Sequence, residues 1–306
     1  MWADVPIILH AAAALAVSAR VLMRPRLEPP VRLAWVLMIV VVPLVGIAAY
    51  VLFGEIRLRR GYLQTRRHVR ERLSGRWRRG PHDLTALPGQ AEPVLRSGGA
   101  VGGFPAVDGN ELHLLPEDDR AIEALAAEVD AARDHAHLLF YIWLPDRSGV
   151  RMVEAAIRAA GRGVTVRVIV DAVGSRLLLR SDHWARMKAA GVECRAAYPV
   201  VYPFLQVLFQ RIDLRNHRKI VVIDNRVAFT GSRNCADTAF AIKPRFAPWI
   251  DILLRIEGPV VRQMQAVFLQ DWMSYTGEDL GDMLLMVPPV NAPGEISQVV
   301  STGPDD

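Results

Sequence analysis

Cysteine and lysine are both scarce in this 306-residue chain. The two cysteines, Cys194 and Cys235, are too few for a disulfide scaffold and do not form the closely spaced pairs of a zinc cluster. We therefore expect two reduced, partly buried thiols in a reducing compartment, and the sequence indicates no metal or other cofactor. Lysine occurs only at positions 188, 219 and 243, so arginine carries nearly all of the positive charge and each lysine is a candidate for a specific role.

Acidic residues are nearly absent from one segment. Between Arg57 and Arg79 stand ten arginines and a single acid, Glu71, which gives a local charge of +9. The whole chain carries +5, so the rest of it carries −4, the difference between the two values. Because an apolar run lies beside this segment, we expect it to contact anionic lipid headgroups, which contribute about 1 kcal/mol per nearby basic residue. A topology signal is a compatible interpretation, and nucleic acid is not an expected partner.

Charge is missing altogether from Leu33 to Phe53, a run of 21 residues. About 20 residues of apolar helix span the hydrocarbon core of a bilayer. Pro43 and Gly46 within the run are better tolerated in a membrane helix than in a soluble one. A buried core helix is the alternative, but such helices rarely reach this length without a polar face. The run therefore predicts a transmembrane helix.

A second apolar stretch, Val5 to Met23, predicts an uncleaved first span, with Arg20 reaching the membrane interface. A secretory signal peptide is the alternative, although the amino end carries Asp4 and lacks a basic region. Prolines in segment 24–32 forbid a continuous helix and predict the turn of a helical hairpin. Basic residues next to a membrane span favour the cytoplasmic side. The ten arginines that follow the second run therefore predict that everything after Phe53 is cytoplasmic, although the three arginines in the turn oppose a simple hairpin.

Composition and periodicity divide the chain into three expected regions. These are a membrane module with two transmembrane helices at 1–56, a basic juxtamembrane segment and linker at 57–110, and a globular domain at 111–306. Helical and strand periodicities alternate in the last region, which predicts an α/β domain with a mixed sheet. The expected helices are 117–133, 149–160, 182–190 and 259–275, and the expected strands are 136–144, 164–171, 220–223, 227–230 and 249–256.

The stretch NHRKIVVIDNRVAFTGSRNCAD, residues 216–237, gathers side chains suited to attack on a phosphodiester. His217 and Lys219 are two residues apart where a strand should begin, so both project from one face. A neutral imidazole can act as nucleophile or proton carrier, while a lysine and the amide of Asn234 hold non-bridging oxygens. Ser232 and the backbone after Gly231 add further donors. Side chains supply the cation, so this chemistry needs no metal.

Asp224 lies five residues beyond Lys219 and has two interpretations. Its carboxylate could orient a histidine or a lysine, or it could begin a tight hairpin turn between two short strands. Taken singly, each residue of the stretch is also common at strand ends and in turns. The joint occurrence at fixed spacing, with one of only three lysines included, is what favours a functional site.

At these residues the sequence resembles the phospholipase D superfamily. The HxKx4Dx6GSxN signature of that superfamily is met without a spacing error by His217, Lys219, Asp224, Gly231, Ser232 and Asn234. The chain is further similar to bacterial cardiolipin synthases. Their membrane module resembles LAWVLMIVVVPLVGIAAYVLFGE, and their first catalytic half resembles YIWLPDRSG, VDAVGSR, LRNHRKIVVIDNRVAFTGSRN and IEGPVV.

The resemblance implies a phospholipase D-like mixed-sheet sandwich domain preceded by a transmembrane helical hairpin, in a multi-pass protein of the bacterial inner membrane with a cytoplasmic catalytic domain. It also implies a phosphatidyltransferase. A histidine like His217 attacks the phosphorus of phosphatidylglycerol, forms a phosphatidyl-histidine and releases glycerol, and a second phosphatidylglycerol then resolves the intermediate to cardiolipin. Lys219, Ser232 and Asn234 would bind the phosphoryl oxygens, and Asp224 would support the charge network.

The chain departs from the family in carrying one copy of the motif. Such enzymes have two copies, whose histidines act as nucleophile and as leaving-group acid across one shared site. No other His-x-Lys pair occurs, and the final QVVSTGPDD resembles the opening strand of a second catalytic half. We expect either a truncated reading of a longer protein, which is the favoured explanation because an isolated strand needs a partner, or two copies of the chain that pair to complete the site.

Two other functions stay open at this stage. The first is a membrane-bound phospholipase D or nuclease that uses water as acceptor. The second is a non-catalytic half-site protein that binds anionic lipid or regulates a full-length partner, an idea supported by the missing second motif. Anionic membrane lipids are the expected partners in each membrane-bound case.

Overall fold

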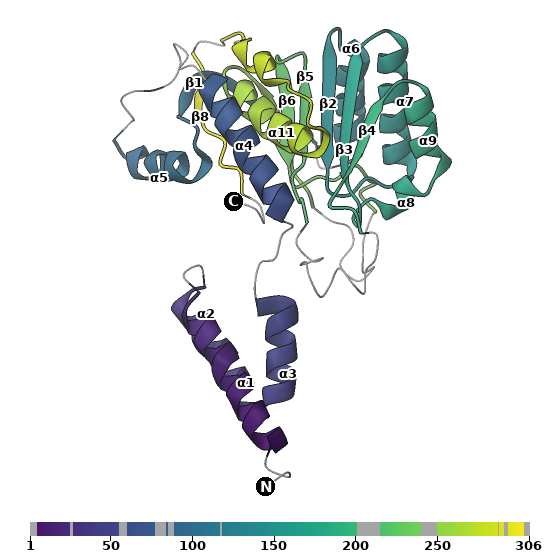
Figure 1. Cartoon of the computed structure of the whole chain (residues 1–306). Helices are drawn as coiled ribbons and strands as arrows, with labels where there is room; N and C mark the ends of the chain where they lie inside the picture. Colours follow the sequence, from purple (N-terminus) through teal and green to yellow (C-terminus); the bar gives the residue numbers. More distant parts are fainter. Residues whose placement is uncertain are drawn as a thin grey trace. The chain divides into compact units, whose positions relative to one another are not determined.

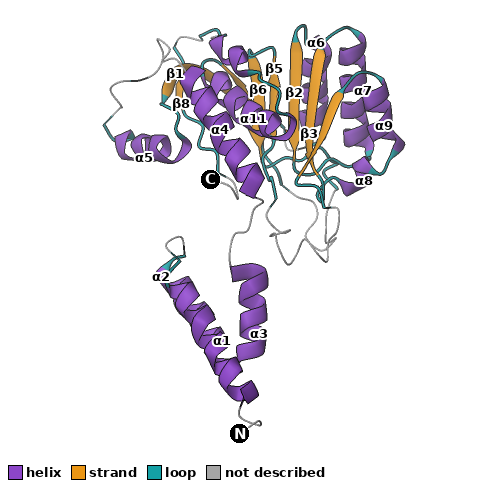
Figure 2. Cartoon of the chain, in the orientation of Figure 1, coloured by secondary structure: helices purple, strands orange, loops and turns teal. Residues whose placement is uncertain are grey.

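The computed structural model describes residues 5–24, 27–54, 60–76, 84, 89–116, 118–200, 215–239, 250–286, 288–290 and 293–302. It contains two compact units, one with Met1–Arg59 and the other with Arg60–Pro199 and Arg215–Asp306. Figure 1 follows the chain through both units, and Figure 2 distinguishes their helices from their strands. Each unit is described by itself.

The first unit consists of helices. These are α1 (Val5–Leu22), α2 (Pro29–Val41), α3 (Pro43–Ala49) and the π-helical turn η1 (Tyr50–Gly54). The apolar run from Leu33 to Phe53 is thus not one continuous helix. It breaks at Val42 because Pro43, which has no N–H to donate, begins α3 instead of continuing α2.

Close packing holds the elements of the first unit together. A Cβ on Gly46 would lie 2.5 Å from the carbonyl oxygen of Met38, so only glycine lets α3 approach α2 this closely. The rings of Trp35 and Tyr50 meet edge to face at 5.5 Å. In the part of the chain that the structure describes, no helix combines the length and the apolar character needed to cross a bilayer. The transmembrane hairpin stays a prediction.

The second unit is built on a mixed sheet that has eight strands among the described residues, in the order β4-β3-β2-β5-β6-β7-β1-β8. The β2–β3 and β3–β4 pairs are parallel and the other neighbours antiparallel, so the predicted mixed sheet is confirmed. The strands are β1 (Val107–Leu114), β2 (His135–Phe140), β3 (Thr165–Asp171), β4 (Glu193–Ala197), β5 (Ile220–Ile223), β6 (Val227–Gly231), β7 (Leu253–Glu257) and β8 (Glu295–Ser297).

Helices cover both faces of this sheet (Figures 1 and 2). One face packs on α6, α7 and α9, and the other on α4 and α11, so alternate strand residues enter different cores: Leu138 faces the first and Leu139 the second. The helices are α4 (Arg60–Arg76), α5 (Glu92–Gly102), α6 (Arg120–Ala131), α7 (Arg147–Gly161), α8 (Arg176–Leu179), α9 (Asp182–Ala189), α11 (Val260–Thr276) and the 3-10 turn η3 (Gly281–Leu285).

The segment predicted to be a lipid-facing arginine run and a linker contains regular structure. It holds α4, α5 and the start of β1 at Val107. Val69 and Leu73 of α4 are buried against the core that includes α11, although α4 as a whole is strongly polar. Two buried apolar side chains among so many arginines give a weak periodic signal, which is why the sequence did not predict this packing.

Candidate active site

The strands β5 and β6 form the predicted hairpin. The motif has two arms, one before β5 and one after β6, and both lie at the open end of the hairpin. His217 and Lys219 precede β5, and residues 231–234 follow β6. Ile220 pairs with Thr230 in the antiparallel register. The Thr230 hydroxyl donates to the Lys219 carbonyl at 2.9 Å, which ties the two arms together. A cavity of about 490 Å³ opens here, lined by His217, Lys219, Gly231 and the chain segment Val299–Thr302.

His217 stacks on an aromatic ring. Its imidazole lies 3.9 Å from the centroid of Tyr141 at an angle of 19°, and Tyr141 directly follows β2. Partial shielding from water lowers the pKa of His217, and the charge of Lys219 lowers it further, while Asp171 acts in the opposite direction. A lowered pKa keeps the imidazole neutral at pH 7, which is the form that can act as a nucleophile.

Lys219 lies beside this ring pair. Its Nζ donates to the His217 carbonyl at 2.8 Å and stands 5.4 Å from the centroid of Tyr141. Burial lowers the pKa of Lys219, and the carboxylate of Asp251 opposes the shift. The ammonium and the imidazole therefore share one cavity wall, where an anion with tetrahedral oxygens can meet both.

Two buried carboxylates hold the backbone on either side of His217. Asp171, at the end of β3, accepts from Arg215 Nε at 3.0 Å and from the Asn216 backbone N–H at 3.4 Å. Asp271, on α11, accepts from the side chains of Asn216 at 2.8 Å and Arg218 at 3.3 Å. These contacts fix the segment that presents the imidazole, much as supporting residues orient a metal ligand.

Asp271 also connects α4 to the chain segment around His217, because it contacts both. Arg66 of α4 forms an ion pair with the fully buried Asp271 carboxylate. Burial by itself would raise the pKa of Asp271, but the charges of Arg218 and Arg66 outweigh it and hold that pKa below its ordinary value. The carboxylate is therefore ionised and paired in the protein interior.

Ser232 and Asn234 lie on the second arm, next to the cavity wall formed by Gly231. The Ser232 hydroxyl donates to Asp251 at 2.6 Å and accepts from the Ile252 N–H at 3.0 Å. The Asn234 side-chain oxygen accepts from the Ile142 N–H at 3.1 Å. Both side chains thus accept hydrogen bonds from nearby backbone N–H groups. The hydrogen bond from Ile142 links the second arm to the residue after Tyr141.

Asp224 is not brought to His217 and Lys219. It follows β5 whereas they precede it, and it has a left-handed φ of 52° in the hairpin turn. Its carboxylate accepts the backbone N–H groups of residues 133, 134 and 135 at 3.0, 2.9 and 2.9 Å. Burial would raise the pKa of Asp224, but these donors outweigh it and lower the pKa. These contacts favour the second interpretation of Asp224, a residue that begins the hairpin turn.

The spacing of the motif did not predict the roles of Tyr141, Asp171 and Asp271. The first two lie in stretches that resemble the family, but Asp271 lies outside all of them, and the spacing of the motif says nothing about residues far along the chain. Asp171 and Asn216 are 45 positions apart, and Arg66 and Asp271 are 205 apart.

Among the described residues, no group of three histidine, cysteine, aspartate or glutamate side chains could hold a metal ion.

Comparison with known proteins agrees with the geometry. Residues 125–272 match the family described as cardiolipin synthase, PLD-like domain, and residues 12–55 match the phospholipase D-nuclease N-terminal family. The chain is 35% identical over 301 residues to cardiolipin synthase A of Edwardsiella ictaluri and 35% identical over 303 residues to cardiolipin synthase A of Proteus mirabilis. Each alignment covers 94% of this chain, which spans 60% of the length of the relative.

A solved structure is also similar. It is Nuc, a phospholipase D family member from Salmonella typhimurium, with 17% identity and a TM-score of 0.39 over 54% of this chain and 95% of that one. The family assignment comes from the matches in sequence. Residues 125–272 therefore form a phospholipase D-like domain of the cardiolipin synthase family, and the chain is similar to cardiolipin synthases A over 94% of its length.

Proposed function

We propose that this chain carries half of the catalytic machinery for cardiolipin formation, the transfer of a phosphatidyl group between two phosphatidylglycerol molecules. The observation that carries the proposal is the His217–Lys219 pair: a neutral imidazole stacked on Tyr141 with an ammonium beside it, on one wall of a cavity. The 35% identity to two cardiolipin synthases supports this choice of substrate.

The reaction has two displacements at phosphorus. In the first, an imidazole nitrogen of His217 bonds to the phosphorus of phosphatidylglycerol, and the bond from phosphorus to the glycerol oxygen breaks. Lys219 offsets the charge on the non-bridging oxygens, and we infer that Ser232 and Asn234, which follow Gly231 of the cavity wall, donate to the same oxygens. In the second displacement, a hydroxyl of another phosphatidylglycerol replaces the imidazole and gives cardiolipin, while its proton passes to a base.

The departing glycerol oxygen must take up a proton. Of the described residues that line the cavity, His217 is the one histidine, and it acts as the nucleophile. We infer that the acid is a histidine of a second motif, supplied by a second catalytic half or by another copy of this chain. The same histidine, deprotonated by the first step, would then act as the base and regain a proton from the attacking hydroxyl.

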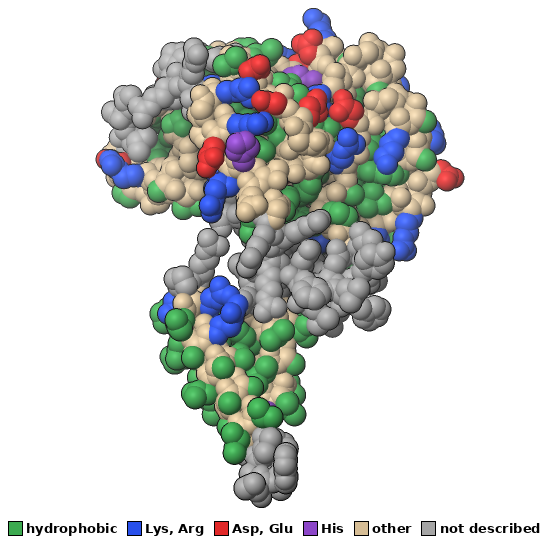
Figure 3. All heavy atoms as spheres, viewed as in Figure 1, with side chains coloured by type: hydrophobic (Ala, Val, Ile, Leu, Met, Phe, Trp, Pro, Cys, Tyr) green, Lys and Arg blue, Asp and Glu red, His purple; other side chains and the backbone are tan. Residues whose placement is uncertain are grey.

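We further infer that the first unit inserts into the bacterial inner membrane and that the catalytic unit is cytoplasmic. Apolar side chains are spread over the face of the first unit seen in Figure 3, and Leu15 and Leu44 are each 74% exposed. Such an apolar surface is unusual for a soluble helical unit and suits contact with lipid. The arginine-rich stretch after it supports the orientation.

The direct test uses membranes that lack other cardiolipin-forming enzymes. The chain is expressed there with a second catalytic half supplied in trans, and lipids are measured by mass spectrometry. We expect cardiolipin and free glycerol, and loss of both with His217→Ala, at least about 10³-fold as for removal of a catalytic nucleophile. Cardiolipin formation unchanged by His217→Ala would disprove the role of that residue, and phosphatidic acid as the product would identify water as the acceptor.

A further inference from the structure

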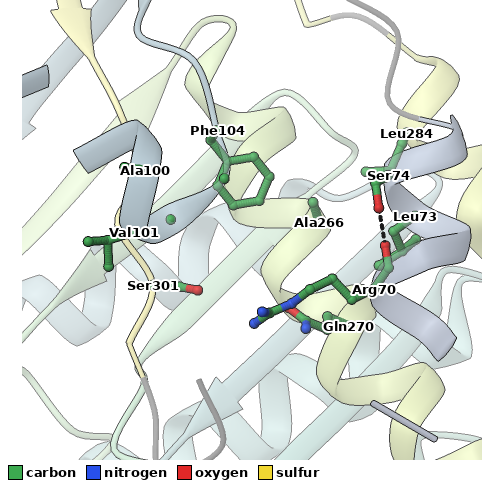
Figure 4. A pocket seen from close by; sticks show the side chains of 12 residues that line it. Arg70, Leu73, Ser74, Ala100, Val101, Phe104, Ala266, Gln270, Leu284 and Ser301 are labelled. Atoms are coloured by element: carbon green, nitrogen blue, oxygen red, sulfur yellow. Dashed lines mark hydrogen bonds between the residues drawn. The ribbon is translucent and has the colours of Figure 1, made fainter. Parts of the chain in front are cut away.

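A second cavity lies in the catalytic unit. It has a volume of about 350 Å³ and is enclosed by α4, the end of α5, α11 and η3. Figure 4 shows Arg70 extending into it from α4 and the ring of Phe104 on the opposite side. Of the described residues that line it, only Ser301 also lines the cavity of His217. The transfer reaction proposed above makes no use of this second cavity.

One part of the cavity wall offers hydrogen-bond donors. Arg70 contributes a guanidinium group, whose planar set of N–H groups suits two oxygens of one phosphate. Gln270 is 8% exposed, and its amide nitrogen Nε2 has no hydrogen-bond partner among the described residues. A buried amide N–H without an acceptor is uncommon in folded proteins, so a small rotation of this side chain toward a ligand oxygen in the cavity would satisfy it.

The rest of the wall is apolar. Leu73 is 6% exposed, Ala266 is 5% exposed and Leu284 is fully buried, and the ring of Phe104 faces the same space. A wall of this kind excludes a small inorganic anion as the complete ligand, because the anion would leave the apolar surface empty. A ligand that satisfies both parts has an anionic head and a hydrocarbon body.

We propose that this cavity binds one anionic phospholipid, with a phosphate oxygen on Arg70 and Gln270 and the first part of an acyl chain along Leu73, Phe104 and Leu284. The volume is that of a site for a small ligand, so it holds the phosphate and the beginning of one chain, and the remainder of the lipid extends outside. This lipid is bound separately from the lipid that His217 attacks, so the site does not depend on the transfer reaction.

The test uses the full chain with His217→Ala, so that no turnover can alter the lipid. The protein is placed in phosphatidylcholine vesicles that contain a phosphatidylglycerol with a photoactivatable diazirine near the carboxyl end of one acyl chain. After illumination, labelled peptides are identified by mass spectrometry. We expect label on peptides of α4, α5 and α11, and at least a fivefold loss of that label with Arg70→Gln.

Two variants separate the cavity from general attraction to the membrane. Arg67→Gln removes the same charge from an exposed position of α4 that does not line the cavity, and it should leave labelling unchanged. Val101→Trp adds bulk from a lining position that is 66% exposed, so it should close the cavity and abolish labelling without affecting the fold.

Three results would overturn the proposal. The first is equal loss of label with Arg67→Gln and Arg70→Gln, which would show surface attraction only. The second is full labelling with Val101→Trp, because the acyl chain would then lie elsewhere. The third is displacement of the label by millimolar inorganic phosphate as effectively as by unlabelled phosphatidylglycerol, which would identify a site for free anions. Failure here leaves the proposed transfer reaction untouched, because that reaction is tested by its own product.

Discussion

Tyr141 covers one face of the His217 ring, and Lys219 stands over the same tyrosine. A second positive charge next to Lys219 is unfavourable, so the protonated imidazole is disfavoured relative to the neutral one. Burial of the ring and the charge of Lys219 together keep His217, the proposed nucleophile, in its neutral form. Binding of a phosphate anion to Lys219 would reduce this effect and favour a proton on the imidazole.

This arrangement predicts the pH dependence of the site. The pKa of His217 lies below its ordinary value of 6.5, so on the acid side kcat/KM with a second catalytic half should fall only as the pH drops through that lowered pKa. Lys219→Met should raise the pKa of His217, measured by NMR of the histidine ring. Lys188→Met is the matched control, because Lys188 lies over Trp184 instead. A wild-type pKa above 6.5 would contradict this account.

At the scale of elements, the β5–β6 hairpin depends on a carboxylate at its turn. Asp224 gathers three backbone N–H groups at the start of β2 and so attaches the hairpin to its neighbouring strand. Its left-handed backbone is also one that aspartate and asparagine adopt more readily than most residues. The conformation and the contacts both assign it to the framework of the sheet.

Asp224→Ala should therefore lower the free energy of unfolding by about 2–4 kcal/mol, because several charge-assisted hydrogen bonds are lost at once. Asp224→Asn should recover part of this loss, since the amide oxygen still accepts and the backbone is tolerated. Urea unfolding measures both. Below the melting temperature, activity per folded molecule should be near that of the wild type, and a large fall in kcat for folded Asp224→Asn would instead assign the carboxylate to catalysis.

The contact between α4 and α11 depends on the ion pair of Arg66 with Asp271. Asp271→Asn removes the buried carboxylate that pairs with the guanidinium groups of Arg66 and Arg218, so we expect a loss of about 3–5 kcal/mol in the free energy of unfolding. Asp282→Asn, at an exposed carboxylate that pairs with Arg76, should leave the unfolding midpoint unchanged. Equal midpoints for the two variants in urea would show that the buried pair is dispensable.

At the scale of the whole molecule, two units with different surfaces share one chain. The first exposes apolar side chains along its helices, while the second has its apolar residues in two cores on either side of a sheet. In water, the exposed apolar surface of the first unit is unfavourable by about 25 cal/mol for each Å². Contact with lipid removes that cost.

The full chain expressed in bacteria is therefore expected to stay in the membrane pellet after washing with 1 M salt and with alkaline carbonate. Salt weakens the attraction between arginines and headgroups, but it does not release an inserted apolar surface. Release by salt would indicate that the arginines alone hold the protein to the membrane. Release by carbonate would show that the first unit does not insert.

Local patterns in the sequence were enough for the hairpin and the pair of residues at its open end. Strand pairing of 220–223 with 227–230 and the shared face of His217 and Lys219 depend on residues within a few positions of each other. The alternation of helix and strand likewise predicted a mixed sheet. Spacing alone could not decide between the two interpretations of Asp224, because a turn aspartate and an orienting aspartate have the same sequence.

Only the tertiary structure decided what surrounds the imidazole and what α4 contacts. Tyr141 follows β2, Asp171 ends β3 and Asp271 lies on α11. They contact residues 215–218 because the sheet order sets β5 beside β2 and α11 packs on the sheet. Such contacts depend on how the elements pack against one another. The periodicity of a single element carries no information about its neighbours. The sequence determined the chemical groups of the site, and packing decided which carboxylates hold them in place.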